Sequence, residues 1–179
     1  MARRPLRVIR REQVYTGRVI SVVREVLDVD NHRLIRETIL HPGSVVIVPF
    51  LDPSHMVFVR QYRRAIGQDI LELPAGTLAP NERPLACATR ELIEETGWRA
   101  RRWKQLARFY PAPGFLSELM TVFVATDLKA VGAHPEPDEL LMPVVLTRNA
   151  AMRKIRSGDI CDAKSIIGVL LTAGRRWNA

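Results

Sequence analysis

The stretch from Gly76 to Trp98 constrains this chain more than any other part of its 179 residues. It reads G-TLAPN-E-RPLACAT-R-E-L-I-E-E-T-G-W, in which two glycines, one arginine and four glutamates stand at fixed offsets. Average residue usage gives a pattern this strict a chance frequency of roughly one in ten million for a chain of this length. The spacing is therefore a feature that the fold has to accommodate.

The second half of this stretch predicts a helix. Asn81 is a favourable N-terminal cap, Pro84 suits a first turn, and Glu82 suits the positive end of the helix dipole. The following residues are good helix formers up to Thr96, and Gly97 is a typical C-terminal stop.

Two faces are expected on this helix. The apolar face is predicted to be buried and recurs at i, i+3 and i+7, at Leu85, Ala88 and Leu92. The carboxylates of Glu91, Glu94 and Glu95 recur at i, i+3 and i+4 and share another face, with Arg90 as the only nearby cation. Two interpretations compete: a solvated acidic surface, or a Mg²⁺ site, because hard cations bind carboxylate and diphosphate oxygens.

Composition sets limits on the rest of the molecule. The length fits one domain, and a hydrophobic content of 47% is enough for a core. No apolar run approaches 18 residues, and the basic N-terminus lacks the apolar region of a secretory signal. Cys87 and Cys161 form no framework and are interpreted as free thiols. We therefore expect a cytoplasmic protein that does not enter the membrane.

The net charge of +8 has three interpretations. The charges are a solvated surface, they attract an anionic substrate into a cleft, or they bind nucleic acid. No helix-turn-helix or zinc-finger signature is present, and aromatic residues make up only 6% of the chain. We therefore do not expect a nucleic-acid partner.

Strands are predicted over the first half of the chain and helices at the acidic stretch and the C-terminus, which indicates an α+β fold. The predicted strands are residues 12–27, 32–40, 44–50, 56–62, 70–73, 103–109 and 119–125. Thr147 is predicted to cap a helix that ends at Gly158, and Asp162 another that ends at Gly174. Residues 1–40 would form N-terminal antiparallel strands, and residues 41–179 the main domain.

The pattern from Gly76 to Trp98 matches the Nudix box, Gly-x5-Glu-x7-Arg-Glu-U-x-Glu-Glu-x-Gly-U with U bulky and apolar, at every defined position. The chain therefore resembles the Nudix hydrolases, which cleave nucleoside diphosphates linked to another group. The resemblance implies a mixed β-sheet sandwiched between α-helices. It also favours the metal site over the solvated surface, with Mg²⁺ as the cofactor and Mn²⁺ as a substitute.

The resemblance implies a role for each charged residue of the box. The principal metal ligands would be Glu91 and Glu95, and the supporting ones Glu82, Glu94 and the carbonyl of Ala75. Arg90 would orient a carboxylate through a salt bridge. Gly76 would let the loop turn and bring backbone close to the metal.

Segments outside the box are similar to the ADP-ribose pyrophosphatases, a Nudix subgroup. They are His41–Gly43, Val59–Arg63, Leu71–Gly76, Tyr110–Phe115, Ser117–Glu118 and Gly158–Lys164. Pro113 stands fifteen positions after Trp98, the spacing that marks the subgroup. The implied activity is hydrolysis of ADP-ribose to AMP and ribose 5-phosphate. Alternatives are a Nudix enzyme acting on a GDP-sugar or on an RNA 5′ end, and a non-catalytic ADP-ribose sensor.

The subgroup also implies which residues meet the substrate. Arg63 would contact a phosphate, since a guanidinium fork matches phosphate oxygens. Glu72 would shape the ribose or metal side of the cleft. Pro113 would contact the substrate, and Glu118 would touch the terminal ribose or a partner loop. The N-terminal strands of residues 1–40 would exchange between the subunits of a homodimer.

The catalytic base of the subgroup is usually a glutamate on a loop well after the box. The acidic loop in that place reads His134-Pro135-Glu136-Pro137-Asp138-Glu139. Glu136 aligns best and Glu139 second, with Glu94 the next candidate. The same loop is also interpreted as an exposed turn.

Overall fold

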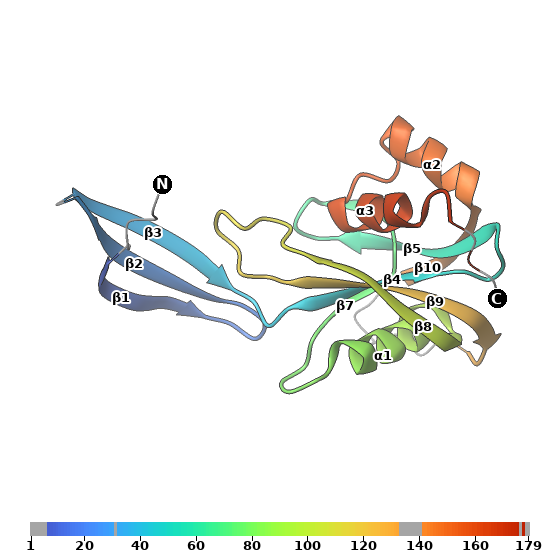
Figure 1. Cartoon of the computed structure of the whole chain (residues 1–179), viewed down its shortest axis with the longest axis horizontal. Coiled ribbons are helices and arrows are strands. Elements are labelled where there is room, and N and C mark those ends of the chain that lie inside the picture. The colour runs from blue at the N-terminus through green and yellow to red at the C-terminus, as the bar shows by residue number, and fades with distance from the viewer. Residues whose placement is uncertain (1–6, 31, 133–140, 176, 178–179) are drawn as a thin grey trace. The chain divides into compact units, whose positions relative to one another are not determined.

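The computed structural model of the chain describes residues 7–30, 32–132, 141–175 and 177 (Figure 1). These residues divide into two compact units. One contains the described part of Met1–Gly43 together with Tyr110–Leu119, and the other contains Ser44–Phe109 with the described part of Met120–Ala179.

The first unit is built on an antiparallel sheet of three strands in the order β1-β2-β3. The strands are β1 (Arg7–Thr16), β2 (Ser21–Val29) and β3 (His32–Leu40). The stretch of residues 12–27 that was predicted as one strand is divided by a turn, in which the Gly17 amide donates to the Ile20 carbonyl at 2.8 Å. The segment Tyr110–Leu119 joins the end of β3, since the Ser117 amide donates to the Ile39 carbonyl at 2.9 Å.

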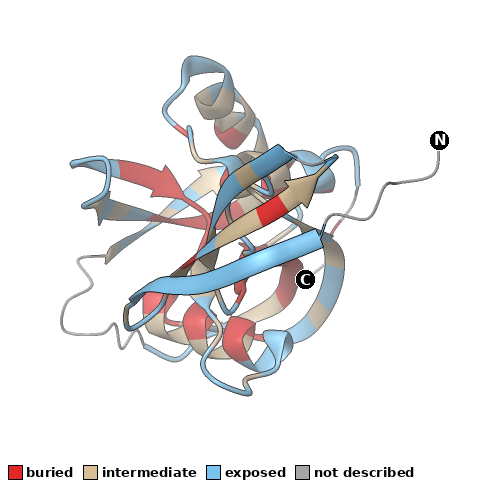
Figure 2. Cartoon of the chain, turned by 90° about the vertical axis from the view of Figure 1, so that its left-hand side faces the viewer, coloured by how far each residue is buried: buried red, intermediate tan, exposed pale blue. Residues whose placement is uncertain are grey.

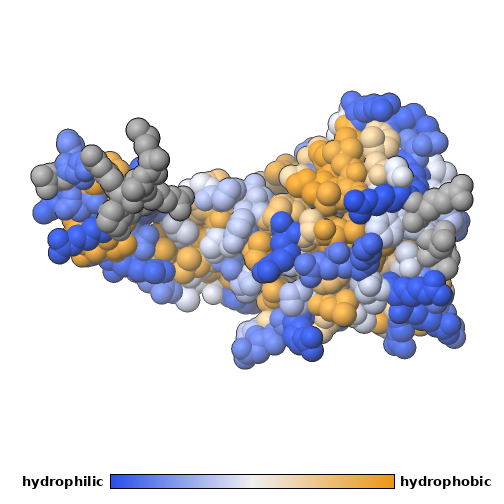
Figure 3. Space-filling view, in the orientation of Figure 1, coloured by the Kyte–Doolittle hydropathy of each residue, from blue (hydrophilic) through white to orange (hydrophobic). Residues whose placement is uncertain are grey.

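The sheet of the first unit leaves much of its surface uncovered in the described part of the chain. Every residue of β1 is exposed, as Figure 2 shows for the long strand that leads from the N-terminal trace. Its apolar members stand among charged ones, so hydrophobic and hydrophilic side chains alternate over this surface (Figure 3). The exposed large apolar side chains of the three-stranded sheet include Val8, Ile9, Val14, Tyr15 and Ile35.

The second unit contains a mixed four-stranded sheet in the order β7-β4-β9-β8. Its strands are β4 (Ser44–Pro49), β7 (Ala75–Thr77), β8 (Trp98–Phe109) and β9 (Met120–Ala130). β4 runs parallel to β9, whereas the other pairs are antiparallel. A second sheet, in the order β10-β5-β6, is formed by β5 (His55–Arg63), β6 (Gln68–Glu72) and β10 (Leu141–Thr147).

Three helices complete the described part of this unit: α1 (Pro84–Thr96), α2 (Arg148–Ser157) and α3 (Ala163–Thr172). Figure 1 shows α1 on one side of the mixed sheet and α2 and α3 on the other. Alternation along β4 explains the arrangement, because successive side chains of a strand point to opposite faces. Val45 and Ile47 pack with α1, while Val46 and Val48 pack with the second sheet and the C-terminal helices.

The α+β fold expected from the sequence is confirmed, with a mixed sheet between helices and antiparallel N-terminal strands. The caps of the last two helices are confirmed as well: Thr147 accepts from the Ala150 amide, and Asp162 from the Ser165 amide. β8 begins at Trp98, five residues before the predicted start at residue 103. The sequence did not indicate a strand there because most of these first side chains are basic and exposed. No helix in the described ranges is long and apolar enough to span a membrane.

Two details predicted for the box helix are wrong. The N-cap is Arg83, not Asn81, and Asn81 has a φ of 62° in the turn before the helix. Leu85 is 45% exposed, whereas Ala88 and Leu92 are buried. The buried stripe instead contains Cys87, Ala88, Glu91, Leu92, Glu95 and Thr96. It is rotated toward the acidic face, so two glutamates lie inside the protein.

Candidate functional site

The acidic face of α1 is organised by one guanidinium group. Arg90 donates from Nε and Nη2 to the two carboxylate oxygens of Glu82, each at 3.1 Å. Its Nη1 donates to Glu91 at 2.7 Å and to Glu94 at 2.9 Å. Hydrogen bonding to Glu82, together with the other two carboxylates, raises the pKa of Arg90, while Arg90 lowers the pKa of Glu82. Three carboxylates of the box are thus gathered at one cation.

Glu82 also makes a contact outside the acidic face of α1. It lies before the first turn of α1, and its Oε2 accepts a hydrogen bond from the Ala79 amide at 2.9 Å. This bond ties the loop between β7 and α1 to the same carboxylate that holds Arg90. The loop and the helix are therefore joined through Glu82.

The two glutamates predicted as principal metal ligands are buried against the strand β7. Glu95 is 3% exposed and accepts a hydrogen bond from the Ala75 amide at 3.1 Å. Glu91 is 8% exposed and lies against Gly76, where a Cβ would stand 2.0 Å from the carboxyl carbon of Glu91. Only a glycine at position 76 leaves room for this carboxylate, so β7 and the acidic face of α1 are matched in shape.

The donor set fits a hard divalent cation in its chemistry. Carboxylate and backbone oxygens are the ligands that Mg²⁺ prefers, and Glu91, Glu95 and the backbone at Ala75 and Gly76 lie together. Within the described ranges, no three acidic, thiol or imidazole side chains form a ready metal-binding group by themselves. Glu82, Glu91 and Glu94 are each paired with Arg90 in this structure.

A second charged cluster connects β5, β6 and α3. The carboxylate of Glu72, 1% exposed, accepts from Arg63 Nε at 2.6 Å and from Arg63 Nη2 at 2.9 Å. Lys164 donates to the same carboxylate and, at 2.8 Å, to Asp162. The sequence predicted Arg63 and Glu72 as substrate-binding residues, and the structure brings them together as an ion pair. Lys164 and Asp162 were not predicted as site residues.

The sequence does contain a signal that Glu72 needs cationic partners. Glu72 stands in a strand between Leu71 and Leu73, both buried. A carboxylate at such a position has to find cations, because an unpaired buried charge is very costly. The sequence offers many cations, however, and only the fold identifies Lys164 as the one at the start of α3.

The two charged clusters interact with each other. Burial acts to lower the pKa of Arg63, but the hydrogen bonds and charge of Glu72 and the charges of Glu95 and Asp162 outweigh it, so this pKa is raised. Glu95 belongs to α1 and Arg63 to β5. The guanidinium of Arg63 and the carboxylate of Glu95 are therefore close enough to influence one another.

Pro113 and Glu118 belong to the first unit. Pro113 is exposed, and Oε1 of Glu118 lies 3.8 Å from Nδ1 of His41. His41 also accepts at Nδ1 from the Gly43 amide at 3.0 Å, as expected of a residue that shapes a turn. Glu136 and Glu139, the candidates for the catalytic base, lie outside the described residues.

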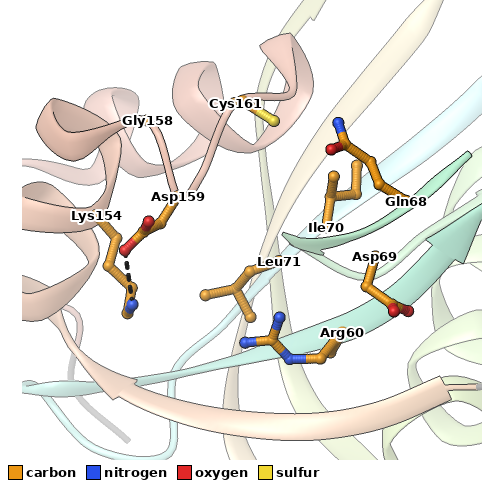
Figure 4. A pocket seen from close by; sticks show the side chains of 9 residues that line it. All are labelled: Arg60, Gln68, Asp69, Ile70, Leu71, Lys154, Gly158, Asp159 and Cys161. Carbon is orange, nitrogen blue, oxygen red and sulfur yellow. Dashed lines mark hydrogen bonds and ion pairs between the residues drawn. The ribbon is translucent and has the colours of Figure 1, made fainter. Parts of the chain in front are cut away.

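A cavity of about 350 Å³ lies between the second sheet and the connection from α2 to α3 (Figure 4). Arg60 points into it, and Lys154 and Asp159 form an ion pair of 3.0 Å at its wall. Its other lining residues are Gln68, Asp69, Ile70, Leu71, Gly158 and Cys161. None of the lining residues belongs to α1 and none was predicted for the site, so the cavity is not lined by the acidic face of α1.

Comparisons with known proteins identify the family to which the chain is similar. Residues 40–159 match the NUDIX domain family. An ADP-ribose pyrophosphatase of Mycobacterium tuberculosis is 36% identical over 175 residues, which cover 95% of this chain and 84% of that protein. A GDP-mannose pyrophosphatase of Salmonella typhimurium is 30% identical, covering 84% and 78%. A crystal structure described as an ADP compounds hydrolase aligns with a TM-score of 0.85 and 26% identity, covering 96% and 94%.

Proposed function

The chain belongs to the Nudix hydrolases, and on that premise we propose that it hydrolyses the diphosphate bond of ADP-ribose to AMP and ribose 5-phosphate. The single observation that carries the proposal is the packing of Glu91 and Glu95 against Gly76 and Ala75, beside the charge of Arg63. The packing supports a site in which carboxylate oxygens would bind a metal ion and the guanidinium of Arg63 would bind a phosphate. The ADP-ribose pyrophosphatase that is 36% identical supports the choice of substrate.

The proposed cofactor is Mg²⁺, with Mn²⁺ as a substitute. Glu91 and Glu95 would be its principal ligands, and the supporting ones would be Glu82, Glu94 and the carbonyl of Ala75. When bound, the ion would neutralise charge on the diphosphate and lower the pKa of a water. Arg90 would hold the carboxylates in place, since it already contacts Glu82, Glu91 and Glu94.

The remaining steps are assigned to residues of the chain. Arg63, held by Glu72, would bind a phosphate through its guanidinium fork. Pro113 and Glu118 would contact the substrate. Glu136 would accept the proton of the attacking water, with Glu139 and then Glu94 as the alternatives. No covalent intermediate is required, because water itself displaces one phosphoryl group.

The chain is proposed to act as a homodimer in the cytoplasm. Support for the dimer comes from the first unit, where apolar side chains such as Val8, Ile9 and Tyr15 are about half exposed. Residues 1–40 would exchange between subunits and contribute to the adenosine pocket. The two free cysteines agree with a reducing compartment.

The second candidate is a GDP-sugar, because the GDP-mannose pyrophosphatase is 30% identical to this chain. One experiment ranks the candidates: the purified protein is incubated with Mg²⁺ and with ADP-ribose, GDP-mannose, other nucleotide sugars or a 5′-capped RNA, and the products are separated by ion-exchange chromatography. We expect kcat/KM to be highest for ADP-ribose, with AMP and ribose 5-phosphate as products. The variant Glu95→Gln serves as the control for contaminating hydrolases.

The outcomes separate the alternatives. Faster cleavage of GDP-mannose would replace ADP-ribose as the substrate, and faster release of an RNA 5′ end would make the +8 charge part of substrate binding. RNA binding through a basic surface would also weaken steeply as salt is raised. Binding of ADP-ribose without hydrolysis of any compound would identify a sensor.

A further inference from the structure

We propose that Lys164 is a positioning residue that keeps Arg63 available for the diphosphate, and that it acts through the buried carboxylate of Glu72. The proposal rests on the proposed function, in which Arg63 binds a phosphate. It adds a residue from α3 to a site otherwise built from α1, β5, β6, β7 and the loop before α1.

The hydrogen bonds of Glu72 fix the orientation of Arg63. Both carboxylate oxygens are engaged by the Nε and Nη2 edge of the guanidinium, at 2.6 and 2.9 Å. The Nη1 group takes no part in this pair. Since the side chain of Arg63 is 38% exposed and that of Glu72 only 1%, the carboxylate holds the guanidinium from inside the protein. The opposite edge of Arg63 is therefore the one turned toward a ligand.

Lys164 lies on the inner side of the same carboxylate. It donates to Oε2 of Glu72, the oxygen that also accepts from Arg63 Nη2, and its side chain is 10% exposed. The depth of the two cations thus differs: Arg63 reaches solvent, whereas Lys164 stays behind it. A residue in this position affects a ligand through Glu72 and Arg63 rather than by contact.

The charges of the cluster explain why a second cation is needed. Arg63 and Lys164 contribute two positive charges, and Glu72 and Asp162 contribute two negative ones, since Lys164 also pairs with Asp162 at 2.8 Å. Without Lys164 the same group would carry a net charge of −1 around Arg63. A diphosphate would then meet a site in which the carboxylates outweigh the guanidinium, in surroundings where charges are weakly screened.

The start of α3 is fixed firmly enough for this role. Asp162 caps the helix by accepting from the Ser165 amide at 3.1 Å. The hydroxyl of Ser165, a buried residue, accepts from the Leu73 amide at 2.6 Å, one residue beyond Glu72. The first turn of α3 is thus bound to the end of β6, which sets Lys164 opposite the carboxylate.

The test compares Lys164→Met, which removes the charge, with Lys164→Arg, which keeps it. With ADP-ribose and Mg²⁺ we expect Lys164→Met to raise KM about tenfold, the equivalent of ~1.4 kcal/mol, and to change kcat less than about twofold. Lys164→Arg should recover most of the affinity. The matched control is Lys154→Met, which breaks the surface pair with Asp159 and should leave both constants unchanged.

A double-mutant cycle tests whether Lys164 acts through Glu72. In a Glu72→Gln background, Lys164→Met should add no more than about twofold to KM, because residues in one network are not additive. A full tenfold effect in that background, an unchanged KM in Lys164→Met, or an equal loss in Lys164→Arg would each overturn the proposal. Thermal unfolding is followed for every variant, and if Lys164→Met does not fold, Lys164→Gln carries the same test.

The failure of this inference is distinguishable from failure of the proposed function. If the wild-type protein does not cleave ADP-ribose, the substrate assignment is wrong, and the cycle is repeated with whichever diphosphate it does cleave. If the wild type cleaves ADP-ribose and the variants keep its KM, the role of Lys164 is wrong and the substrate stands.

Discussion

The carboxylate of Glu91 occupies the space that a side chain at position 76 would fill. A Cβ added to Gly76 would lie 2.0 Å from the carboxyl carbon and 2.3 Å from Cγ of Glu91. Glu91 is held there from the other side by Arg90, at 2.7 Å. Gly76 of β7 and Glu91 of α1 thus pack as one steric unit, although most of the box separates them in the sequence.

We predict that Gly76→Ala lowers kcat at least about tenfold and raises the Mg²⁺ concentration for half-maximal activity. The reason is steric, since the added methyl would displace the carboxylate of Glu91 from its place on β7. Steady-state rates over a magnesium titration provide the measurement. Unchanged magnesium dependence would contradict the assignment of Glu91 as a ligand.

The control for crowding alone is Gly168→Ala. A Cβ there would lie 2.5 Å from Cδ1 of Leu73, in the apolar core, so the variant should lose about 1–3 kcal/mol of unfolding free energy. It should keep the magnesium dependence of the wild type, because its clash is with a hydrocarbon side chain. Comparing the two alanines separates lost stability from a damaged metal site.

Replacing Glu95 by Gln keeps the shape of the side chain and removes its charge. We expect an intact fold and a kcat lower by at least about 10²-fold, the scale lost with one strong electrostatic stabiliser. Glu94→Gln should have a smaller effect, because Glu94 is partly exposed and paired with Arg90. Near-normal turnover of Glu95→Gln at saturating Mg²⁺ would refute its role as a principal ligand.

The two cysteines should differ in reactivity. Burial, with the charges of Glu91 and Glu82, raises the pKa of Cys87 to about 12, so at pH 8 it is a protonated thiol. The thiolate is the nucleophile, and Cys161 is exposed. A chromogenic disulfide at pH 8 should therefore titrate one thiol per native chain and two in denaturant. In Cys161→Ser no native thiol should react; rapid labelling of Cys87 would show that α1 opens readily.

Much of this architecture was predictable from the sequence, because its signals are local. The glycine after α1, the caps Thr147 and Asp162, and the alternating strands each depend on neighbouring residues. The failures arose where tertiary contacts override local preference. Leu85 fits an apolar stripe by spacing, but α1 turns Glu91 and Glu95 inward to reach β7, so Leu85 faces outward.

The candidate site shows the same division. The box predicted that Arg90 would hold a carboxylate, since both residues stand on one helix. Lys164 was not predicted, because 92 residues separate it from Glu72 and only the joining of α3 to β6 makes them neighbours. Spacing along one helix determines the first contact, whereas the second depends on the whole fold.

The homodimer is tested by gel filtration with light scattering. We expect a mass near twice 20.3 kDa, because the apolar side chains of β1 need a partner surface. Deleting residues 1–18, which removes β1, should weaken the dimer and raise KM for ADP-ribose together. A truncated monomer with full activity would refute strand exchange, while a dimer unaffected by the deletion would place the interface elsewhere.

The catalytic base is tested with Glu136→Gln, which we expect to lower kcat by about 10²–10⁴-fold, the usual range for such catalysis. KM and the magnesium affinity should stay nearly unchanged, because a general base acts in the transition state and not in ground-state binding. Steady-state kinetics at several Mg²⁺ concentrations give all three constants. A change in magnesium affinity alone would make Glu136 a ligand instead of a base.

Glu139→Gln provides the comparison within the same loop, and its effect should be smaller. The reason is the resemblance to the ADP-ribose pyrophosphatases, in which Glu136 aligns best with the base and Glu139 second. A greater loss in Glu139→Gln than in Glu136→Gln would make Glu139 the base and shift the alignment of this loop by three positions. If neither substitution matters, the proton goes elsewhere, with Glu94 the next candidate, and the loop is an exposed turn.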